Sequence, residues 1–367
     1  MAFAFTDDLG PEKVVELYDA GVGLKAIVVV DNTAAGPAIG GTRMAPDVTL
    51  EECFGLARAM TFKNAAAGLP HGGAKSVIAA DPAMPIADKE RLIRAFARGL
   101  REITSYIPGP DMGTNEEAMA WIRDENGRSV GLPRELGGIP LDVIGATGYG
   151  LAACAEIAEK HCDVRLKGAR VAVQGFGAVG YHGARFLANL GCVLVAAADS
   201  RGMTLNPDGL DIEALAEHHK TGEGVAAFAG GTAGDRDAIV GVDCDIWIPA
   251  ARPNVLTAAN AGQVKARLIL QGANIPATAE AEAALHARGV LSVPDFIANA
   301  GGVICASVEY HGGSESGALA TIKEKIQRNT DEVLRRMQRD AVLPRAAAVA
   351  MARERVERAM RFRRDHR

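Results

Sequence analysis

The sequence lacks the features that would direct it to a membrane, out of the cell or to nucleic acid. No apolar run reaches the roughly 20 residues that a transmembrane helix needs. Met1–Asp8 has neither the basic start nor the apolar stretch of a signal peptide. The formal net charge of the 367 residues is −5, and residues 353–367 are rich in arginine, a stretch that we interpret as a solvated helical tail. We therefore expect a cytoplasmic protein that binds neither membranes nor nucleic acid.

The sequence also lacks the spacings of disulfide and metal chemistry. Its six cysteines form no CxxC pair and no zinc-like pattern, and its eight histidines are scattered. Most of the cysteines sit in apolar segments, where a free cysteine behaves as a small hydrophobic residue. We expect reduced thiols and no bound metal.

Predicted strands alternate with predicted helices along the chain, which indicates an α/β protein. The chain length favours two domains. In the first half we predict strands at 26–30 and 76–80, and helices at 89–103 and 116–124. A further helix begins at the capping box of Thr49 and Glu52. Residues 107–115 carry two prolines and two glycines and are predicted to form a loop. In the second half we predict parallel strands at 170–173, 193–198, 245–248, 268–271 and 291–293.

A dinucleotide fingerprint opens the second half. Gly175-Phe176-Gly177-Ala178-Val179-Gly180 follows a predicted strand and begins a helix, and Asp199 follows about twenty residues later, at the end of the next strand. The first glycine permits the tight turn, the second lets the backbone approach a pyrophosphate, and the third lets helix pack on strand. The helix N-terminus then offers free N–H groups to the phosphates. A glycine-rich turn that binds nothing is the alternative.

The residues after the second strand bear on the choice of cofactor. Asp199 would bind the ribose hydroxyls of NAD. Ser200 and Arg201 follow at once and could instead hold the 2′-phosphate of NADP. NAD is the prediction, with NADP left open.

Three charged residues in the first half are candidates for the chemistry. Lys63 and Lys75 bracket a glycine-rich turn, and Asp111 lies in the proline-rich segment. Lys75 sits between Gly73-Ala74 and apolar residues, so we expect it to be partly buried and a candidate general base. The alternatives are a solvated surface lysine and an aspartate that only accepts turn hydrogen bonds.

Six motifs in the same order carry a resemblance to a known family. They are Gly36-Pro37-Ala38-Ile39-Gly40-Gly41-Thr42-Arg43-Met44, the segment from Lys63 through Gly68-Leu69-Pro70-His71-Gly72-Gly73-Ala74-Lys75, Pro110-Asp111-Met112-Gly113-Thr114, Ala146-Thr147-Gly148-Tyr149-Gly150, Gly272-Ala273-Asn274 and Asn299-Ala300-Gly301-Gly302-Val303. Together they resemble the glutamate/leucine/phenylalanine/valine dehydrogenase family from about residue 20 to 340.

The resemblance implies an oxidative deamination of an L-amino acid to a 2-oxo acid and ammonia. Lys63 would bind the substrate α-carboxylate, Lys75 would act as the general base, and Asp111 would exchange protons with the amino group. Hydride would pass from the α-carbon to the nicotinamide. The remaining implied contacts are Gly40 and Gly41 along the pocket, and Thr147, Asn274 and Asn299 at the nicotinamide end or the substrate.

The resemblance also implies the architecture. Residues 1–140 would form an α/β substrate-binding and oligomerisation domain, and residues 141–319 a Rossmann-type, doubly wound domain. The helices from about 320 to 367 would fold back on the first domain. We expect a homo-oligomer, a hexamer or an octamer.

Two positions bear on the substrate. Members of the family that select glutamate carry a lysine where this chain has Ile39, and a serine where it has Ala306. A glutamate side chain would then be buried without a partner for its charge. This predicts an apolar pocket, like that of a leucine or phenylalanine dehydrogenase, for a branched-chain or aromatic amino acid. By contrast, residues 119–122, 135–138 and 199–202 resemble the glutamate-type members.

Three alternatives stay open from the sequence alone. The first is a glutamate dehydrogenase with an altered pocket. The second is a different Rossmann oxidoreductase with a catalytic histidine, for which only His71 lies inside a motif. The third is a nucleotide-sensing protein that is not an enzyme.

Overall fold

The computed structural model describes residues 4–363 and divides the chain into two compact units. The first takes its described residues from Met1–Leu141, Val303–Ala318 and Val349–Arg367, and the second comprises Asp142–Gly302 and Leu319–Ala348.

A five-stranded sheet organises the first unit, in the order β1-β2-β4-β3-β5. Strand β2 runs antiparallel to both β1 and β4, whereas β3 is parallel to both β4 and β5. The parallel trio therefore brings the carboxyl ends of β3 and β5 to the same edge. The strands are β1 (Lys13–Asp19), β2 (Leu24–Asn32), β3 (Ala38–Ala45), β4 (Gly73–Ala79) and β5 (Tyr106–Pro110).

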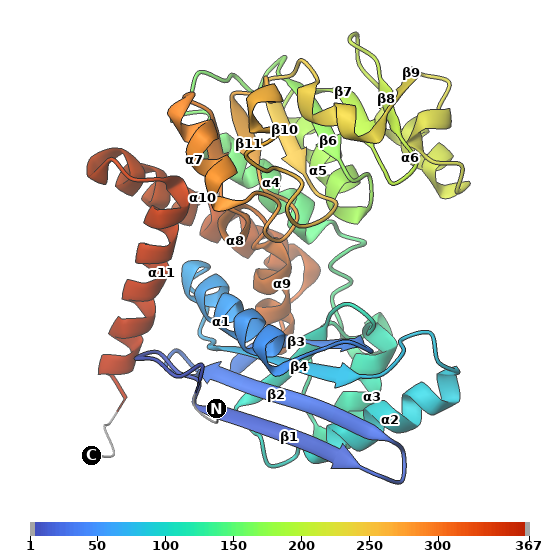
Figure 1. Ribbon diagram of the computed structural model, residues 1–367, viewed down its shortest axis with the longest axis vertical. Coiled ribbons are helices and arrows are strands. Elements are labelled where there is room, and N and C mark those ends of the chain that lie inside the picture. The colour runs from blue at the N-terminus through green and yellow to red at the C-terminus, as the bar shows by residue number, and fades with distance from the viewer. Residues whose placement is uncertain (1–3, 364–367) are drawn as a thin grey trace. The chain divides into compact units, whose positions relative to one another are not determined.

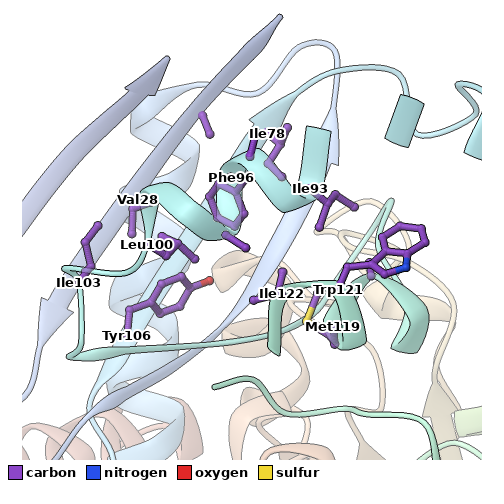
Figure 2. Close-up of a cluster of buried hydrophobic side chains, with 14 of the residues drawn as sticks. Val28, Ile78, Ile93, Phe96, Leu100, Ile103, Tyr106, Met119, Trp121 and Ile122 are labelled. Atoms are coloured by element: carbon purple, nitrogen blue, oxygen red, sulfur yellow. The ribbon is translucent and has the colours of Figure 1, made fainter. Parts of the chain in front are cut away.

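Helices cover both faces of this sheet (Figure 1): α1 (Leu50–Ala66) lies on one face, and α2 (Ile86–Gly99) and α3 (Glu116–Asn126) lie on the other. Successive strand residues point to opposite faces. Val29 therefore packs with Cys53 under α1, whereas Val28 packs with Phe96 of α2 in the larger cluster of Figure 2. The expected helix start is confirmed, because Thr49 Oγ1 accepts the Glu52 N–H at 3.1 Å.

The loop predicted for residues 107–115 is wrong in its first part, because β5 occupies Tyr106–Pro110. Prolines are tolerated in an edge strand where the missing N–H would face away from the ladder. The carbonyl of Pro108 points away from β3 and accepts the Val130 N–H at 2.9 Å. The nitrogen of Pro108 faces the same side, so no bond to β3 is lost. Residues 111–115 do form the expected loop.

A seven-stranded sheet organises the second unit, in the order β12-β11-β10-β6-β7-β8-β9. The predicted parallel strands are all present, as β6 (Arg170–Gln174), β7 (Val193–Ala198), β10 (Ile246–Pro249), β11 (Leu268–Leu270) and β12 (Leu291–Val293). The Rossmann-type sheet is thus confirmed. Two short antiparallel strands that were not predicted extend one edge, β8 (Met203–Leu205) and β9 (Thr232–Gly234).

The remaining helices complete the two units and include the C-terminal segment. They are α4 (Ala146–Ala158), α5 (Ala178–Asn189), α6 (Ile212–Lys220), α7 (Ala279–Ala287), α8 (Asp295–Ala298), α9 (Gly301–Tyr310), α10 (Glu315–Asp340) and α11 (Pro344–Arg361).

The units differ from the predicted domains in two segments. Residues 303–318 group with the first unit, and residues 319–348 with the second rather than the first. Contacts explain the second difference: Gln327 donates to Glu156 at 2.8 Å, and Arg345 pairs with Glu282 at 2.7 Å. Residues 349–363 do group with the first unit. Residues 364–367, the end of the arginine-rich tail, lie outside the described residues.

Two further expectations concern the cysteines and the membrane. All six cysteines are unpaired, and all but Cys162 are buried. Between residues 4 and 363, no helix has both the length and the apolar character to cross a membrane.

Candidate active site

Buried Lys75 and partly exposed Asp111 form an ion pair in the first unit. Lys75 belongs to the central strand β4, opposite Val29 of β2, and its side chain is 7% exposed. Its Nζ contacts Oδ2 of Asp111, the first residue after β5. The strand holds Lys75 among apolar neighbours, and the carboxylate compensates the ammonium for the loss of hydration. Two of the three predicted catalytic and substrate-binding charges are therefore brought together.

Asp111 is fixed by its loop and by a second cation. Its backbone N–H donates to Thr114 Oγ1 at 3.0 Å, and that hydroxyl donates to the carbonyl of Thr42 at 2.7 Å. Arg43 Nε lies 3.3 Å from the same Oδ2 that faces Lys75. Burial alone would raise the pKa of Asp111, but Lys75 and Arg43 outweigh it and hold the pKa below its usual value. The carboxyl group is therefore ionised at neutral pH.

The glycines of β3 differ in what they do. A Cβ on Gly40 would lie 1.6 Å from the carbonyl oxygen of Ala74, so the strand packing itself requires glycine there. A Cβ on Gly41 would lie 3.0 Å from Lys75 Nζ and 2.8 Å from Asp111 Cβ. Gly41 thus borders the ion pair and leaves its surface bare for a ligand.

Tyr106 supports this strand from the core. Its ring belongs to the cluster of Figure 2, and its hydroxyl donates to the carbonyl of Gly40 at 3.1 Å and contacts Ser76 Oγ at 2.8 Å. Burial raises the pKa of this hydroxyl, which therefore keeps its proton and remains a donor. Tyr106 stands in no sequence motif and so could not be predicted, whereas Arg43 lies inside a motif but its contact with Asp111 was not predicted.

Lys63 lies in the last turn of α1 and is half-buried. The next residue ties this helix end to the start of β3, because Asn64 Nδ2 donates to the carbonyls of Gly72 at 2.6 Å and Ile39 at 3.3 Å. Lys63 is therefore held next to the chain segment that carries Ile39.

Ile39 and Ala306 come together in one buried apolar cluster. Its other members are Ile107 of β5 and Val130, and none of the four is more than 9% exposed. The cluster carries no charge. Glu309, one turn after Ala306, accepts N–H groups of the loop that follows Val130 and was not singled out by the sequence analysis.

His71 is a buried residue of the glycine-rich turn. It is 1% exposed, its Nδ1 lies 3.0 Å from the carbonyl oxygen of Pro37, and its ring packs against Tyr310 and His311. Burial, assisted by His311, lowers its pKa, so the ring is neutral. Its hydrogen bond joins the glycine-rich turn to the segment before β3.

The fingerprint of the second unit has the geometry of a phosphate-binding turn. Gly175 has φ +94°, and a Cβ there would lie 2.7 Å from the Ala251 nitrogen. A Cβ on Gly180 would lie 1.9 Å from the carbonyl oxygen of Gly175, so this glycine lets α5 pack on the strand. A Cβ on Gly177 would meet nothing within 4 Å, and no side chain caps α5. The first N–H groups of α5, at Ala178 and Val179, therefore suit a pyrophosphate.

Asp199 stands at the end of β7 as predicted, with its carboxylate held by the backbone. Oδ1 accepts the Arg201 N–H and Oδ2 the Val225 N–H, both at 2.8 Å, and His219 Nε2 lies 3.7 Å from Oδ2. Each oxygen retains a lone pair for a ribose hydroxyl. Ser200 and Arg201 are exposed, and Arg201 donates to the carbonyl of Gly222.

Asn299 links the later motifs within the second unit. Its Nδ2 donates to the carbonyl of Gly272 at 3.3 Å and to Asn274 Oδ1 at 3.2 Å. Its Oδ1 is buried and has no hydrogen-bond partner, so it is an acceptor suited to a donor on a bound molecule. Thr147, half-buried in the first turn of α4, lies beside Gly302, whose added Cβ would be 3.4 Å from Thr147 Oγ1.

Fold and site together define a class of protein: an oxidoreductase with a Rossmann unit and a second unit that holds a lysine–aspartate pair. The family described as glutamate/leucine/phenylalanine/valine dehydrogenase matches residues 137–364, and its dimerisation domain matches residues 11–128. The chain therefore belongs to the glutamate/leucine/phenylalanine/valine dehydrogenase family and is an amino-acid dehydrogenase. Among residues 4–363, no three histidine, cysteine or acidic side chains gather as metal ligands.

Curated relatives cover nearly the whole chain. The chain is 38% identical to the glutamate dehydrogenase of Aeropyrum pernix over 356 residues, which are 90% of this chain and 85% of the relative. It is 36% identical to the NADP-specific glutamate dehydrogenase of Saccharolobus shibatae over 354 residues, with 90% and 83% covered.

Solved structures agree with the fold. The leucine-bound hetero-hexameric glutamate dehydrogenase of Thermus thermophilus has a TM-score of 0.86 and 34% identity, with 97% of this chain and 91% of that one covered. The L-tryptophan dehydrogenase of Nostoc punctiforme has a TM-score of 0.77 and 26% identity, with 98% and 99% covered. The predicted likeness to a leucine or phenylalanine dehydrogenase is not supported, because the curated relatives are named glutamate dehydrogenases.

The Lys75–Asp111 pair predicts a pH-dependent stability. In Asp111→Asn the Lys75 ammonium stays buried without its carboxylate, so we expect a loss of about 3 kcal/mol in the free energy of unfolding at pH 7. Because the folded-state pKa of Asp111 lies below 3.8, this loss should hold down to about pH 5 and shrink as the pH falls through that pKa. Urea denaturation at fixed protein concentration measures it.

Asp47→Asn is the matched control, since Asp47 is exposed and in the same unit. It should change the free energy of unfolding by less than about 0.5 kcal/mol at any pH. Equal losses for Asp47→Asn and Asp111→Asn would contradict a stabilising ion pair at Lys75.

Proposed function

We propose that this chain catalyses the NAD(P)-dependent oxidative deamination of an L-amino acid to a 2-oxo acid and ammonia, and its reversal. The observation that carries the proposal is the buried Lys75–Asp111 pair beside the bare backbone of Gly41. An amine, a carboxylate and an open surface in one place are what proton transfer at an amino-acid α-carbon requires.

Each charged group has its own part in the reaction. Lys63 binds the α-carboxylate of the amino acid and orients the α-carbon. A bound nicotinamide would supply the hydride acceptor, and loss of hydride from that carbon would turn the amine into an imine. Lys75, as the free amine that remains once its ammonium proton has passed to solvent, takes a proton from the water that attacks the imine carbon, and Asp111 exchanges protons with the departing amine. Collapse of the carbinolamine releases ammonia and the 2-oxo acid.

The ion pair suits this sequence of proton transfers. Asp111 is ionised at neutral pH, so it can accept a proton from the amino group and return it to the leaving nitrogen. Its negative charge also stabilises positive charge that develops on the imine. Arg43 keeps the carboxylate in place while Lys75 changes its protonation state.

The cofactor would be held by the second unit. The α5 N-terminus and Gly177 would receive the pyrophosphate, and Asp199 the adenosine ribose. Thr147 and Asn299, with its unpaired Oδ1, would contact the nicotinamide end. Asp199 favours NAD. The exposed Arg201, together with the NADP-specific relative, keeps NADP as a second candidate.

Two kinds of substrate are supported by different observations. Glutamate has the support of the comparisons, because the curated relatives carry that name. An apolar amino acid is supported by the apolar cluster alone, where Ile39, Ile107, Val130 and Ala306 offer no partner to a second carboxylate. The tryptophan dehydrogenase of similar fold and equal span is consistent with the second candidate.

Assembly and location remain part of the proposal. The matched dimerisation domain supports an oligomer, and the hetero-hexameric Thermus structure is an example with six subunits. A homo-oligomer, a hexamer or an octamer, stays the prediction. A cytoplasmic location fits the small-molecule substrates and the unpaired cysteines.

The reaction is tested by initial rates of NADH and NADPH formation with leucine, valine, phenylalanine, tryptophan and glutamate in turn. We expect turnover of at least one of them, and a fall in kcat of about 10²–10⁴-fold in Lys75→Ala because its proton acceptor is gone. Absence of turnover with every amino acid and both cofactors would contradict the proposal.

The same panel on Ile39→Lys separates the two substrates. A new charge-assisted hydrogen bond of about 1.5–3 kcal/mol should raise kcat/KM for glutamate relative to leucine by at least about tenfold. Ile39→Met is the matched apolar control and should leave the ratio near its wild-type value. An unchanged ratio in Ile39→Lys would show that residue 39 does not face the substrate side chain.

The phosphate-binding turn is tested by a pair of glycine variants. Gly177→Ala adds a Cβ that meets no protein atom within 4 Å, so the fold should keep its stability while NADH binding weakens tenfold or more. Gly180→Ala adds a Cβ 1.9 Å from a carbonyl oxygen and should lower thermal stability as well. Fluorescence titration and thermal unfolding measure the two effects. Unweakened NADH binding by Gly177→Ala would rule out a pyrophosphate at this turn.

A further inference from the structure

The four members of the apolar cluster are held in two different ways. Ile39 and Ile107 stand directly opposite each other on β3 and β5, so the sheet ladder fixes them. Val130 follows α3 in a connecting segment, and Ala306 lies on α9. No strand pairing holds Val130 or Ala306 in place, so another contact must set the distance between them.

Glu309 supplies a connection between these two segments. It follows Ala306 by three residues on α9, so both lie on one face of the helix. Its Oε1 accepts the Leu132 N–H at 3.2 Å and its Oε2 accepts the Ile139 N–H at 2.8 Å. One carboxylate thus joins α9 to both ends of the segment that begins beside Val130.

The anchored segment also supports the ion-pair loop. Val130 N–H donates to the carbonyl of Pro108, and a Cβ on Gly131 would lie 2.5 Å from Pro110 Cδ, next to Asp111. A shift of this segment would therefore move Val130 relative to β5. Glu309 is 8% exposed, and a carboxylate so buried keeps its place only while its hydrogen bonds are made.

We propose that Glu309 is a positioning residue that sets the width of the substrate side-chain pocket by fixing Val130 and Ala306 relative to each other. This inference rests on the proposed function. Glu309 touches no reacting atom and acts through the two apolar side chains. Its loss should relax discrimination between amino acids that differ by one methylene, because such discrimination is worth only about 1–3 kcal/mol and depends on a close fit.

Glu309→Gln is the primary test, because the amide has nearly the same shape but cannot accept both N–H groups. We expect the ratio of kcat/KM between the best amino acid of the panel and its homologue with one more methylene to fall at least threefold. The KM for the cofactor should stay unchanged. Glu135→Gln is the matched control, an exposed glutamate of the same loop with the same change in charge, and should keep the ratio.

Hydrogen exchange provides a readout that is independent of catalysis. The amide protons of Leu132 and Ile139 should exchange faster in Glu309→Gln than in wild type, and not in Glu135→Gln. Faster exchange with a lower ratio supports the inference. A folded Glu309→Gln enzyme that keeps the wild-type ratio overturns it, and so does unchanged exchange.

The outcomes distinguish this inference from the proposed function. If the wild-type enzyme turns over no amino acid, the proposed function is contradicted. The role in substrate selectivity that we assign to Glu309 is then contradicted with it. Turnover by wild type with equal loss of kcat/KM for both homologues in Glu309→Gln would leave the function standing and reduce Glu309 to a structural residue.

Discussion

The buried contact between Lys75 and Asp111 is the constraint on which the first unit depends. An ammonium inside a sheet is costly unless a carboxylate faces it, and a carboxylate at that depth needs cations and N–H groups in turn. The parallel pairing of β4, β3 and β5 meets this need, because it places Asp111, directly after β5, within reach of the Lys75 side chain on β4. Arg43 and Thr114 then hold the carboxylate. The same arrangement that stabilises the pair gives the site its acid and its base.

Glycine at selected positions determines where ligands can approach. Because Gly41 has no side chain, the ion pair of the first unit stays uncovered on that side. Gly177 leaves the start of α5 uncovered in the second unit in the same way. Gly40 and Gly180 are required by packing, because an added Cβ would clash with a backbone carbonyl oxygen in each case. The signature motifs therefore mix residues required by packing with residues required by ligands, and only the structure separates the two.

Much of this could be predicted from the sequence where the signal is local. The strand–glycine turn–helix pattern at residues 170–190 and the capping box at Thr49 give the corresponding elements, because neighbours along the chain determine them. Strand β5 could not be predicted, because nothing in the local sequence shows that the nitrogen of Pro108 faces away from the ladder. Glu309 could not be found, since its partner Leu132 is 177 residues away in the sequence. The meeting of Ile39 and Ala306 was expected from the resemblance alone, and the structure places both in one cluster.

Chemical rescue tests the central claim, that Lys75 carries a proton in the reaction, most directly. The rate of NAD(P)H formation by Lys75→Ala would be measured with the preferred amino acid, with and without a small alkylamine that fills the space of the lost side chain. We predict a saturable recovery of activity that grows as the free-base form of the amine becomes more abundant. A folded variant that binds NADH normally and shows no recovery with any amine would contradict the account.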